Sequence, residues 1–235
     1  MKNLIIADKK LPEQAKKNLK QFGFLIEFST QSITYEAISG HPDIFMCQLP
    51  DKLILAPNLP FESFKIFSDN KIHFDKGEQN VGMKYPQSAV YNSVVTENYF
   101  IFKKGILDTK MIQNLSSQKL ISVSQGYCRC NLLPLRDDSF ITSDKNIYQK
   151  LTKEKLNILY VNPKQIILPG FKHGFFGGAA GVIENDVFLS GCLKYFSDGE
   201  NVKSFLQNLN YSIIELYDGP LFDGGSIFCL TPSVK

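Results

Sequence analysis

Short runs of β-branched and aromatic residues alternate along the chain with segments of helical periodicity. The first copy of this pattern has a β-rich run at 3–8, an amphipathic segment at 11–22 and a second β-rich run at 24–28. Apolar residues three or four positions apart share one face of a helix, and in the middle segment these are Ala15, Leu19 and Phe22. The pattern therefore predicts a strand, a helix and a second strand.

The same order recurs five times at intervals of about 47 residues, a period typical of repeat architectures. The other helical segments are 60–67, 107–115, 143–151 and 197–209. An earlier strand is predicted for each unit at 44–47, 89–95, 128–133, 178–183 and 226–230. Turn-forming pairs that join four of these strands to the next are Pro50-Asp51, Glu97-Asn98, Asp137-Asp138 and Asn185-Asp186.

The fifth unit is split between the two ends of the chain. Its first strand is 226–230, whereas its second strand, helix and third strand occupy 3–28. If 226–230 pairs with 3–8, the units form a ring that leaves no sheet edge open. We therefore expect one α/β domain over residues 1–235, a five-fold pseudo-symmetric α/β propeller of five ββαβ units closed by pairing of its terminal strands.

Charge and hydropathy argue against a nucleic-acid or membrane partner, and cysteine usage indicates the redox state of the thiols. Lys and Arg number 26 against 23 Asp and Glu, and only two of the basic residues are Arg, so the Arg/Lys cluster of a strong nucleic-acid binder is missing. No apolar stretch approaches the roughly 20 residues of a membrane span. Five scattered cysteines without a secretion signal indicate reduced thiols. We expect a cytoplasmic protein that binds neither nucleic acid nor membrane; a protein partner stays open.

The loops that lead into the first strands are rich in glycine and polar residues, and a ring brings them together near its axis. Convergent polar groups above an apolar core are typical of a small-molecule pocket. The candidates in these loops are His41, Asp43, Asn92, Arg129, His173 and Asp223.

Several of these residues admit two interpretations. His41 is a candidate base oriented by Asp43, or the two belong to a turn fixed by Pro42. His173 precedes a glycine-rich run that either binds an anion or forms a tight turn.

Cys128 and Cys130 would share one face of a predicted strand, with Arg129 on the other, where it pairs with a carboxylate or a ligand. The two cysteines lack the spacing and the second ligand pair that zinc prefers. We therefore expect no metal and no other cofactor.

The segment Asp223-Gly-Gly-Ser-Ile-Phe-Cys229-Leu-Thr231 resembles the Gly-Gly-containing segment that delivers the nucleophilic Cys in deiminases of the pentein superfamily. That superfamily has five ββαβ units and includes arginine and agmatine deiminases, dimethylarginine dimethylaminohydrolases and amidinotransferases. The resemblance implies a hydrolase or transferase of a small guanidino- or nitrogen-rich metabolite. Cys229 would be its nucleophile, assisted by His41 and Asp43, and Asn92, Arg129, His173 and Asp223 would contact the substrate.

A second hypothesis is a non-catalytic domain that binds a small ligand or a protein, as the eukaryotic ribosome anti-association factor of the superfamily does. Phe228 stands where the family commonly has His, and Gly126–Cys130 contain neither residue of the family's His-x-Asp motif. Cys229 would then be a structural thiol among apolar neighbours. A third hypothesis is a pocket that uses His41, Asp43 and Asp223 without a thiol.

Overall fold

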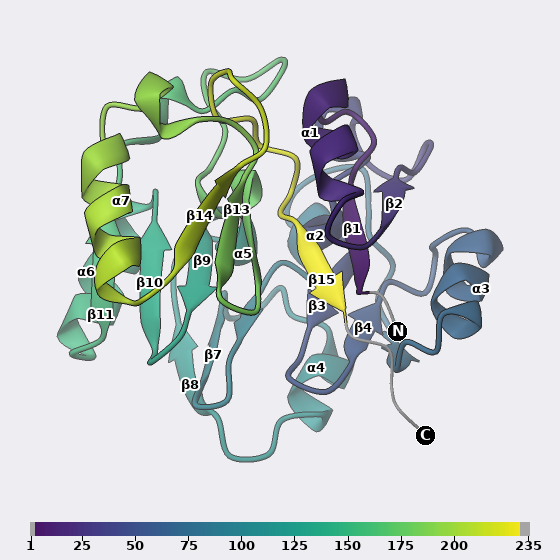
Figure 1. Cartoon of the computed structure of the whole chain (residues 1–235). Helices are drawn as coiled ribbons and strands as arrows, with labels where there is room; N and C mark the ends of the chain where they lie inside the picture. The colour runs from purple at the N-terminus through teal and green to yellow at the C-terminus, as the bar shows by residue number, and fades with distance from the viewer. Residues whose placement is uncertain (1–2, 231–235) are drawn as a thin grey trace.

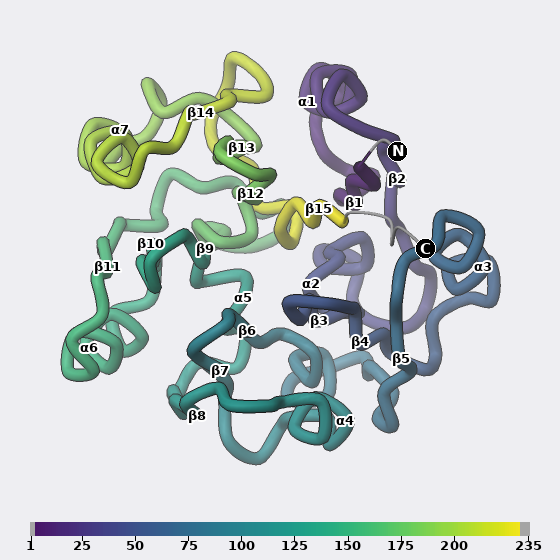
Figure 2. Tube along the Cα trace, turned by 60° about the horizontal axis from the view of Figure 1, so that its bottom comes forward, coloured from purple at the N-terminus to yellow at the C-terminus, as the bar shows by residue number. Residues whose placement is uncertain are grey.

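Five small sheets surround a central axis in the computed structural model, which describes residues 3–230 (Figures 1 and 2). Each sheet has three strands, and its second strand pairs antiparallel with the first and parallel with the third. The first strands lie nearest the axis and the long helices lie on the outside of the ring (Figure 2). The predicted propeller of ββαβ units is confirmed.

The ring is closed by the two ends of the described chain. In this unit the sheet order is β15 (Phe228–Leu230), β1 (Leu4–Asp8) and β2 (Phe24–Phe28), with α1 (Glu13–Leu19) between β1 and β2. Leu4 pairs with Leu230, Ile5 with Cys229 and Ile6 with Phe228. Thr231, the last residue of the segment that resembles the deiminases, lies outside the described residues.

The other four units follow along the chain. Their strands and helices are β3 (Met46–Gln48), β4 (Leu53–Leu55), α3 (Phe61–Asp69) and β5 (Phe74–Lys76); β6 (Val94–Val95), β7 (Tyr99–Phe102), α4 (Thr109–Gln113) and β8 (Lys119–Ser122); β9 (Leu132–Leu135), β10 (Ser139–Thr142), α6 (Lys145–Lys153) and β11 (Asn157–Tyr160); and β12 (Ala180–Ile183), β13 (Asp186–Leu189), α7 (Gly199–Asn208) and β14 (Ser212–Glu215).

The axial ends of the first strands differ from the prediction, because a helical turn replaces the expected extended chain. These turns are α2 (Pro42–Phe45), α5 (Cys128–Asn131) and the 3-10 helices η2 (Gln87–Ala89) and η4 (Gly177–Ala179). In three hairpins the second strand ends opposite the first residue of the shortened first strand, as Thr142 does opposite Leu132. The N–H groups before that residue bond within a turn, as the Asn131 N–H does to the Tyr127 carbonyl oxygen.

The helical turn α5 changes the expected placement of Cys128 and Cys130. Cys128 and Cys130 lie on a helical turn, so strand alternation does not put them on one face. The Cys128 thiol donates to the Gln125 carbonyl oxygen at 2.9 Å, whereas the Cys130 thiol donates to the Asp43 carboxylate at 3.2 Å. Only Cys130 therefore lies at the axis with Asp43.

Apolar side chains fill the space between each sheet and its helix. Ala15 and Leu19 of α1 are fully buried, as the helical spacing predicts, and α1 ends at Leu19. Phe22 lies beyond the helix and packs edge-on against Phe188 of β13, with ring centroids 4.7 Å apart. No helix within residues 3–230 is long and apolar enough to cross a membrane.

We expect the closing strand pair to contribute a large share of the stability. Ile5 on β1 is fully buried, so Ile5→Ala removes apolar contacts and leaves a cavity, at a cost of about 2–5 kcal/mol in the free energy of unfolding. Phe24→Ala on the adjacent β2 is the matched control, because Phe24 is 58% exposed, and its cost is about 0.5 kcal/mol or less. Equal losses in urea unfolding would contradict this prediction.

Candidate functional site

Five ionisable side chains from separate parts of the sequence meet at the axis, and we call them the axial cluster. Asp8 ends β1, His41 precedes α2, Asp43 lies in α2, Cys130 lies in α5, and Asp223 lies in the loop before β15. Each is at most 3% exposed. Charged groups are rarely buried this completely unless they are paired or bind a ligand.

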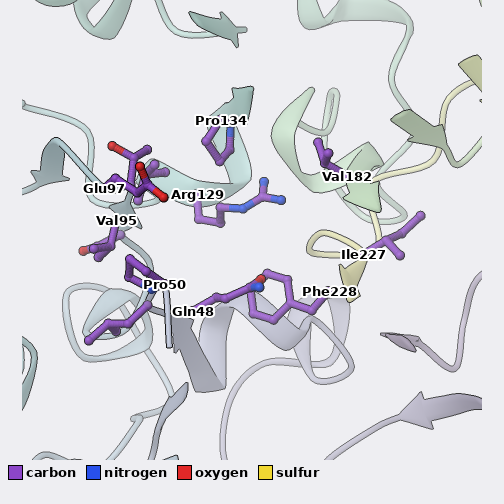
Figure 3. A pocket seen from close by; sticks show the side chains of 13 residues that line it. Gln48, Pro50, Val95, Glu97, Arg129, Pro134, Val182, Ile227 and Phe228 are labelled. Carbon is purple, nitrogen blue, oxygen red and sulfur yellow. The ribbon is translucent and has the colours of Figure 1, made fainter. Parts of the chain in front are cut away.

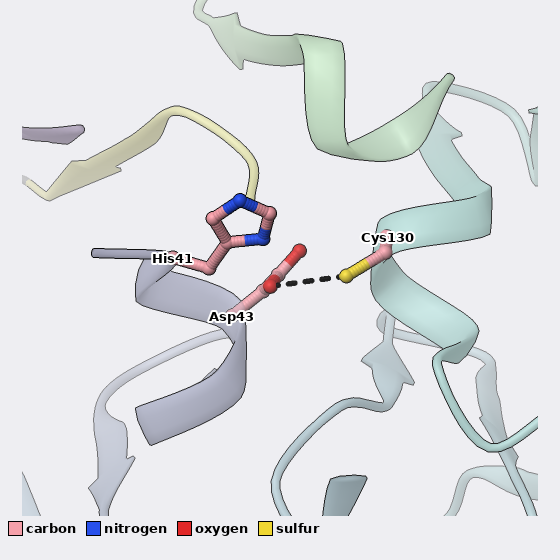
Figure 4. A group of neighbouring side chains, drawn as sticks. All are labelled: His41, Asp43 and Cys130. Atoms are coloured by element: carbon pink, nitrogen blue, oxygen red, sulfur yellow. Dashed lines mark hydrogen bonds between the residues drawn. The ribbon is translucent and has the colours of Figure 1, made fainter. Parts of the chain in front are cut away.

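His41 lies between two of the carboxylates. Its Nε2 is 3.8 Å from Asp8 Oδ2, and its Nδ1 is 3.9 Å from Asp223 Oδ1. Figure 4 shows a ring nitrogen of His41 and the Cys130 sulfur on either side of the Asp43 carboxylate. The sequence-based hypothesis that His41 and Asp43 are neighbours in a site therefore has the required geometry.

Two polar side chains hold Asp43 and Cys130 in place. The Asn92 amide donates to the Asp43 backbone oxygen at 2.9 Å and to Cys130 Sγ at 3.1 Å, while its oxygen accepts from the Cys130 N–H at 3.2 Å. The Ser226 hydroxyl donates to Asp43 Oδ2 at 2.7 Å. Asn92 was a candidate from the sequence, and through these hydrogen bonds it positions Asp43 and Cys130.

Asp223 is held by backbone amides. Phe175 N–H donates to its Oδ2 at 2.8 Å, and Gly225 N–H donates to its Oδ1 at 3.0 Å. His173 lies beside this segment, with its Nδ1 2.9 Å from the Gly174 carbonyl oxygen and its ring against Phe175. The structure therefore places His173 next to the loop that positions Asp223, outside the axial cluster.

Glycines allow the backbone to approach the cluster closely. A Cβ at Gly40 would overlap the Asp8 carboxylate, and one at Gly178 would overlap the Asp223 carboxylate. Gly225 has a positive φ of 66°, and a side chain there would collide with His41. Glycine is therefore required at these three positions of the glycine-rich loops, because any side chain there would overlap the cluster.

Arg129 is buried near the axial cluster, and its charge lowers the pKa of Asp43. Its Nη1 donates to the Gly177 carbonyl oxygen at 2.9 Å, and its guanidinium carbon is 5.7 Å from the centre of the Phe228 ring. Within residues 3–230 no carboxylate lies within 4.0 Å of this guanidinium. Arg129 also lines a cavity of about 350 Å³ with Pro134, Val182 and Phe228 (Figure 3). No residue of the axial cluster lines that cavity.

Cys229 lies on β15 and is separate from the axial cluster. Its side chain packs at the edge of the apolar cluster that contains Ile5 and Phe188. Burial raises the pKa of its thiol to about 11, so it is protonated at neutral pH. Among the described residues, no hydrogen bond joins this thiol to His41 or Asp43. The nucleophilic role of Cys229 stays a prediction, and Cys130 is the thiol that the fold brings to these two residues.

Sequence reasoning did not select Asp8 or Cys130 as site residues. Asp8 ends the apolar strand Leu4–Asp8, and a carboxylate at the end of a fully buried strand was the signal that would have identified it. Cys130 was considered only as half of a two-cysteine motif. Its true partners, His41 and Asp43, come from a different unit, and their proximity depends on the closed ring.

Burial dominates the electrostatics of the cluster. It raises the pKa of Asp8 to about 6 and, with the charge of Asp43, raises that of Asp223 to about 8. The pKa of Asp43 is also raised, and that of the Cys130 thiol is raised well above its ordinary value. Burial lowers the pKa of His41 to about 3, which leaves the imidazole neutral. The charges of Lys10 and Arg129 oppose this effect at Asp8 and Asp43, but burial outweighs them, and a further cation in direct contact would stabilise the ionised carboxylates.

The sequence matches, over residues 6–228, the group described as "Family of unknown function (DUF6873)", and the chain belongs to that family. A search of the curated proteins finds no match.

Solved structures of the pentein superfamily share the fold at low sequence identity. A dimethylarginine dimethylaminohydrolase from Pseudomonas aeruginosa, complexed with citrulline, has 10% identity and a TM-score of 0.54, with 92% of each chain covered. Agmatine deiminase from C. jejuni has 14% identity and a TM-score of 0.58, over 100% of this chain and 83% of that one. An amidinotransferase from Microseira wollei has 12% identity and a TM-score of 0.52, over 90% and 87%. The chain thus has the pentein fold.

We expect stability to fall as pH rises from about 6.5 to 8. Folded Asp223, with a pKa of about 8, keeps its proton through this range, whereas the unfolded carboxyl has lost it, so the folded state binds more protons. One such group lowers the free energy of unfolding by about 1.4 kcal/mol per pH unit. Neutral His41 gives the opposite slope only below the unfolded His pKa of about 6.5.

Urea unfolding at several pH values measures this slope. Asp223→Asn removes the titrating group and flattens the slope between pH 6.5 and 8, whereas Asp51→Asn, at an exposed turn, leaves it unchanged. If Asp223→Asn kept the wild-type slope, the assignment to Asp223 would be wrong.

Proposed function

We propose that this protein is a hydrolase or transferase that acts on a small cationic, nitrogen-rich metabolite of the guanidino type, bound at the axial cluster. The observation that carries the proposal is the meeting of three buried carboxylates, Asp8, Asp43 and Asp223, with a neutral imidazole and a thiol. The fold that the chain shares with enzymes named for agmatine, dimethylarginine and amidino transfer supports a substrate of the guanidino type.

Carboxylates suit a guanidinium because its planar N–H donors pair with them in bidentate geometry. Burial is the main cause of the raised pKa values of Asp8 and Asp223. A bound guanidinium adds positive charge beside them, so binding shifts both carboxyls toward their ionised form and releases protons. Affinity for such a ligand is therefore expected to rise with pH between about 6 and 8.

The reaction that fits these groups begins with attack of a thiolate on the guanidino carbon. A sulfur–carbon bond forms, an amine leaves, and water or an acceptor amine then cleaves the sulfur–carbon bond in a hydrolase or a transferase, respectively. The Asp43 carboxylate accepts the Cys130 S–H hydrogen bond and is the group placed to take the thiol proton, because a His41 with a pKa of about 3 is a weak base. A bound cation next to the thiol lowers its pKa and favours the thiolate.

Two thiols are candidates for the nucleophile. The resemblance to the deiminases favours Cys229. The contacts favour Cys130, because its thiol donates to Asp43 at 3.2 Å, and Asp43, two residues after His41, lies beside that imidazole at the axis (Figure 4). We assign the nucleophile to Cys130 and keep Cys229 as the competing prediction.

A non-catalytic binding domain is the second candidate function. The observation that favours it is the protonated state of both thiols, since burial raises the pKa of Cys130 and of Cys229. The same carboxylates would then bind a cationic ligand without turning it over.

Binding of arginine, agmatine and dimethylarginine tests the carboxylate site. We expect at least one of them to raise the melting temperature of the wild-type protein. Asp223→Asn removes a carboxylate charge and weakens this binding about 10-fold or more. Asp69→Asn, at the exposed end of α3, is the control and leaves the affinity unchanged. Absence of binding by all three compounds would overturn the assignment to guanidino ligands.

Release of ammonia or amine by wild type, Cys130→Ser and Cys229→Ser separates the nucleophile candidates. We expect Cys130→Ser to lose turnover by about 10³-fold or more, because the hydroxyl is a far weaker nucleophile at neutral pH, while ligand binding persists. Loss confined to Cys229→Ser would instead confirm the prediction from the resemblance. Binding without turnover in the wild type would favour the non-catalytic function.

A further inference from the structure

The axial cluster contains the three donor types of a transition-metal site. His41, Asp43 and Cys130 each offer one atom, a ring nitrogen, a carboxylate oxygen and a sulfur, and these atoms lie within 4.8 Å of one another. Tetrahedral zinc, with bonds of about 2.0–2.3 Å, holds its ligands about 3.5 Å apart. Cys130 Sγ and Asp43 Oδ1 are already 3.2 Å apart, so modest side-chain rotations bring the set to that spacing.

An unpartnered buried atom points independently to a ligand. His41 Nδ1 has no hydrogen-bond partner within the described part of the chain, although the side chain is only 2% exposed. Such a buried polar atom costs about 1–3 kcal/mol if it remains unsatisfied. In Figure 4 a ring nitrogen of His41 is directed at the space next to the Asp43 carboxylate. The neutral imidazole is also the form that binds a metal.

Ser226 and Asn92 form hydrogen bonds to the proposed ligand residues. Ser226 donates to Asp43 Oδ2 at 2.7 Å, which leaves Oδ1 free to coordinate. Asn92 donates to Cys130 Sγ at 3.1 Å, a bond that stabilises a thiolate. Hydrogen bonds of this kind orient metal ligands and tune their charge.

We propose that His41, Asp43 and Cys130 bind a divalent transition-metal ion, with Zn²⁺ as the best fit. Binding converts the Cys130 thiol to a thiolate and releases its proton, so the S–H···O bond to Asp43 is replaced by metal–sulfur and metal–oxygen bonds. A sulfur donor selects Zn²⁺ over Mg²⁺ and Ca²⁺, which prefer oxygen ligands. Three protein ligands leave a fourth position for water or a metabolite, the arrangement of catalytic rather than structural zinc.

His41, Asp43 and Cys130 could bind a metal ion whether or not the protein has the proposed function. A catalytic role for that ion, however, rests on the proposed function. Asp8 and Asp223 remain available to a cationic metabolite, because they are not part of the ligand set. With Cys130 held as a metal ligand, a metal-bound water would replace its sulfur as the nucleophile. The two proposals thus share a location but make separate predictions.

Titration of Co²⁺ into chelator-treated protein, without any metabolite, tests the site. We expect one equivalent to produce the thiolate-to-cobalt charge-transfer band and the visible bands of four-coordinate Co²⁺, and Zn²⁺ to displace it while Mg²⁺ does not. Cys130→Ser is expected to abolish the charge-transfer band, and His41→Gln to weaken binding at least 10-fold. Cys192→Ser is the matched control and keeps the band, because the Cys192 thiol lies next to Glu215 on the outer part of the ring.

Circular dichroism and the unliganded melting temperature show whether each variant is folded. Should a cluster variant fail to fold, the wild type remains decisive: Zn²⁺ raises its melting temperature, and alkylation of Cys130, followed by mass spectrometry of the peptide, slows when Zn²⁺ is present. No charge-transfer band in folded wild type, or a band that survives in folded Cys130→Ser, would overturn the metal site. The guanidino-ligand assays are run on metal-free protein, so either proposal can fail alone.

Discussion

The antiparallel pairing of β15 with β1 is the interaction on which the axial cluster depends. It joins residues more than two hundred positions apart and turns a row of ββαβ units into a ring. Asp8 lies at the end of β1, and Asp223 lies just before β15, so both reach the axis through this one pair of strands. The Asp43 N–H bonds to the Gly225 carbonyl oxygen at 3.2 Å, which fixes the next unit against the closing one.

Desolvation is the second constraint, and it gives the cluster its chemical character. Three carboxylates and a thiol share a space from which water is largely excluded, so their neutral forms are favoured and His41 stays neutral. Close approach of glycine backbone keeps this space narrow. A cation, whether a guanidinium or a metal ion, would offset the desolvation that disfavours the ionised carboxylates and thiolate, and the same set of residues could therefore bind either one.

The likeness to the pentein enzymes shows the fold, whereas the proposed substrate class depends on the geometry of the axial cluster. The solved structures share the fold at 10–14% identity, so they inform the architecture more than the position of any catalytic atom. Here the segment that resembles the deiminases places Cys229 on the closing strand, with its side chain in an apolar cluster. Cys130, from the third unit, has the polar neighbours that a reactive or metal-binding thiol requires.

The sequence by itself determined the repeat, the order of strands and helices, and the closure of the ring, because hydrophobic periodicity and turn residues are local signals that each unit carries. It also singled out His41, Asp43, Asn92 and Asp223, since polar residues in glycine-rich loops stand out against apolar strands. Only the tertiary structure decided that Asp8 and Cys130 join them, that Arg129 lines a cavity which the axial cluster does not reach, and that His173 and Cys229 lie apart. The reason is physical: a side chain's direction at the axis depends on where a helical turn replaces strand and on which units the closed ring brings together, and local sequence does not encode these contacts between units.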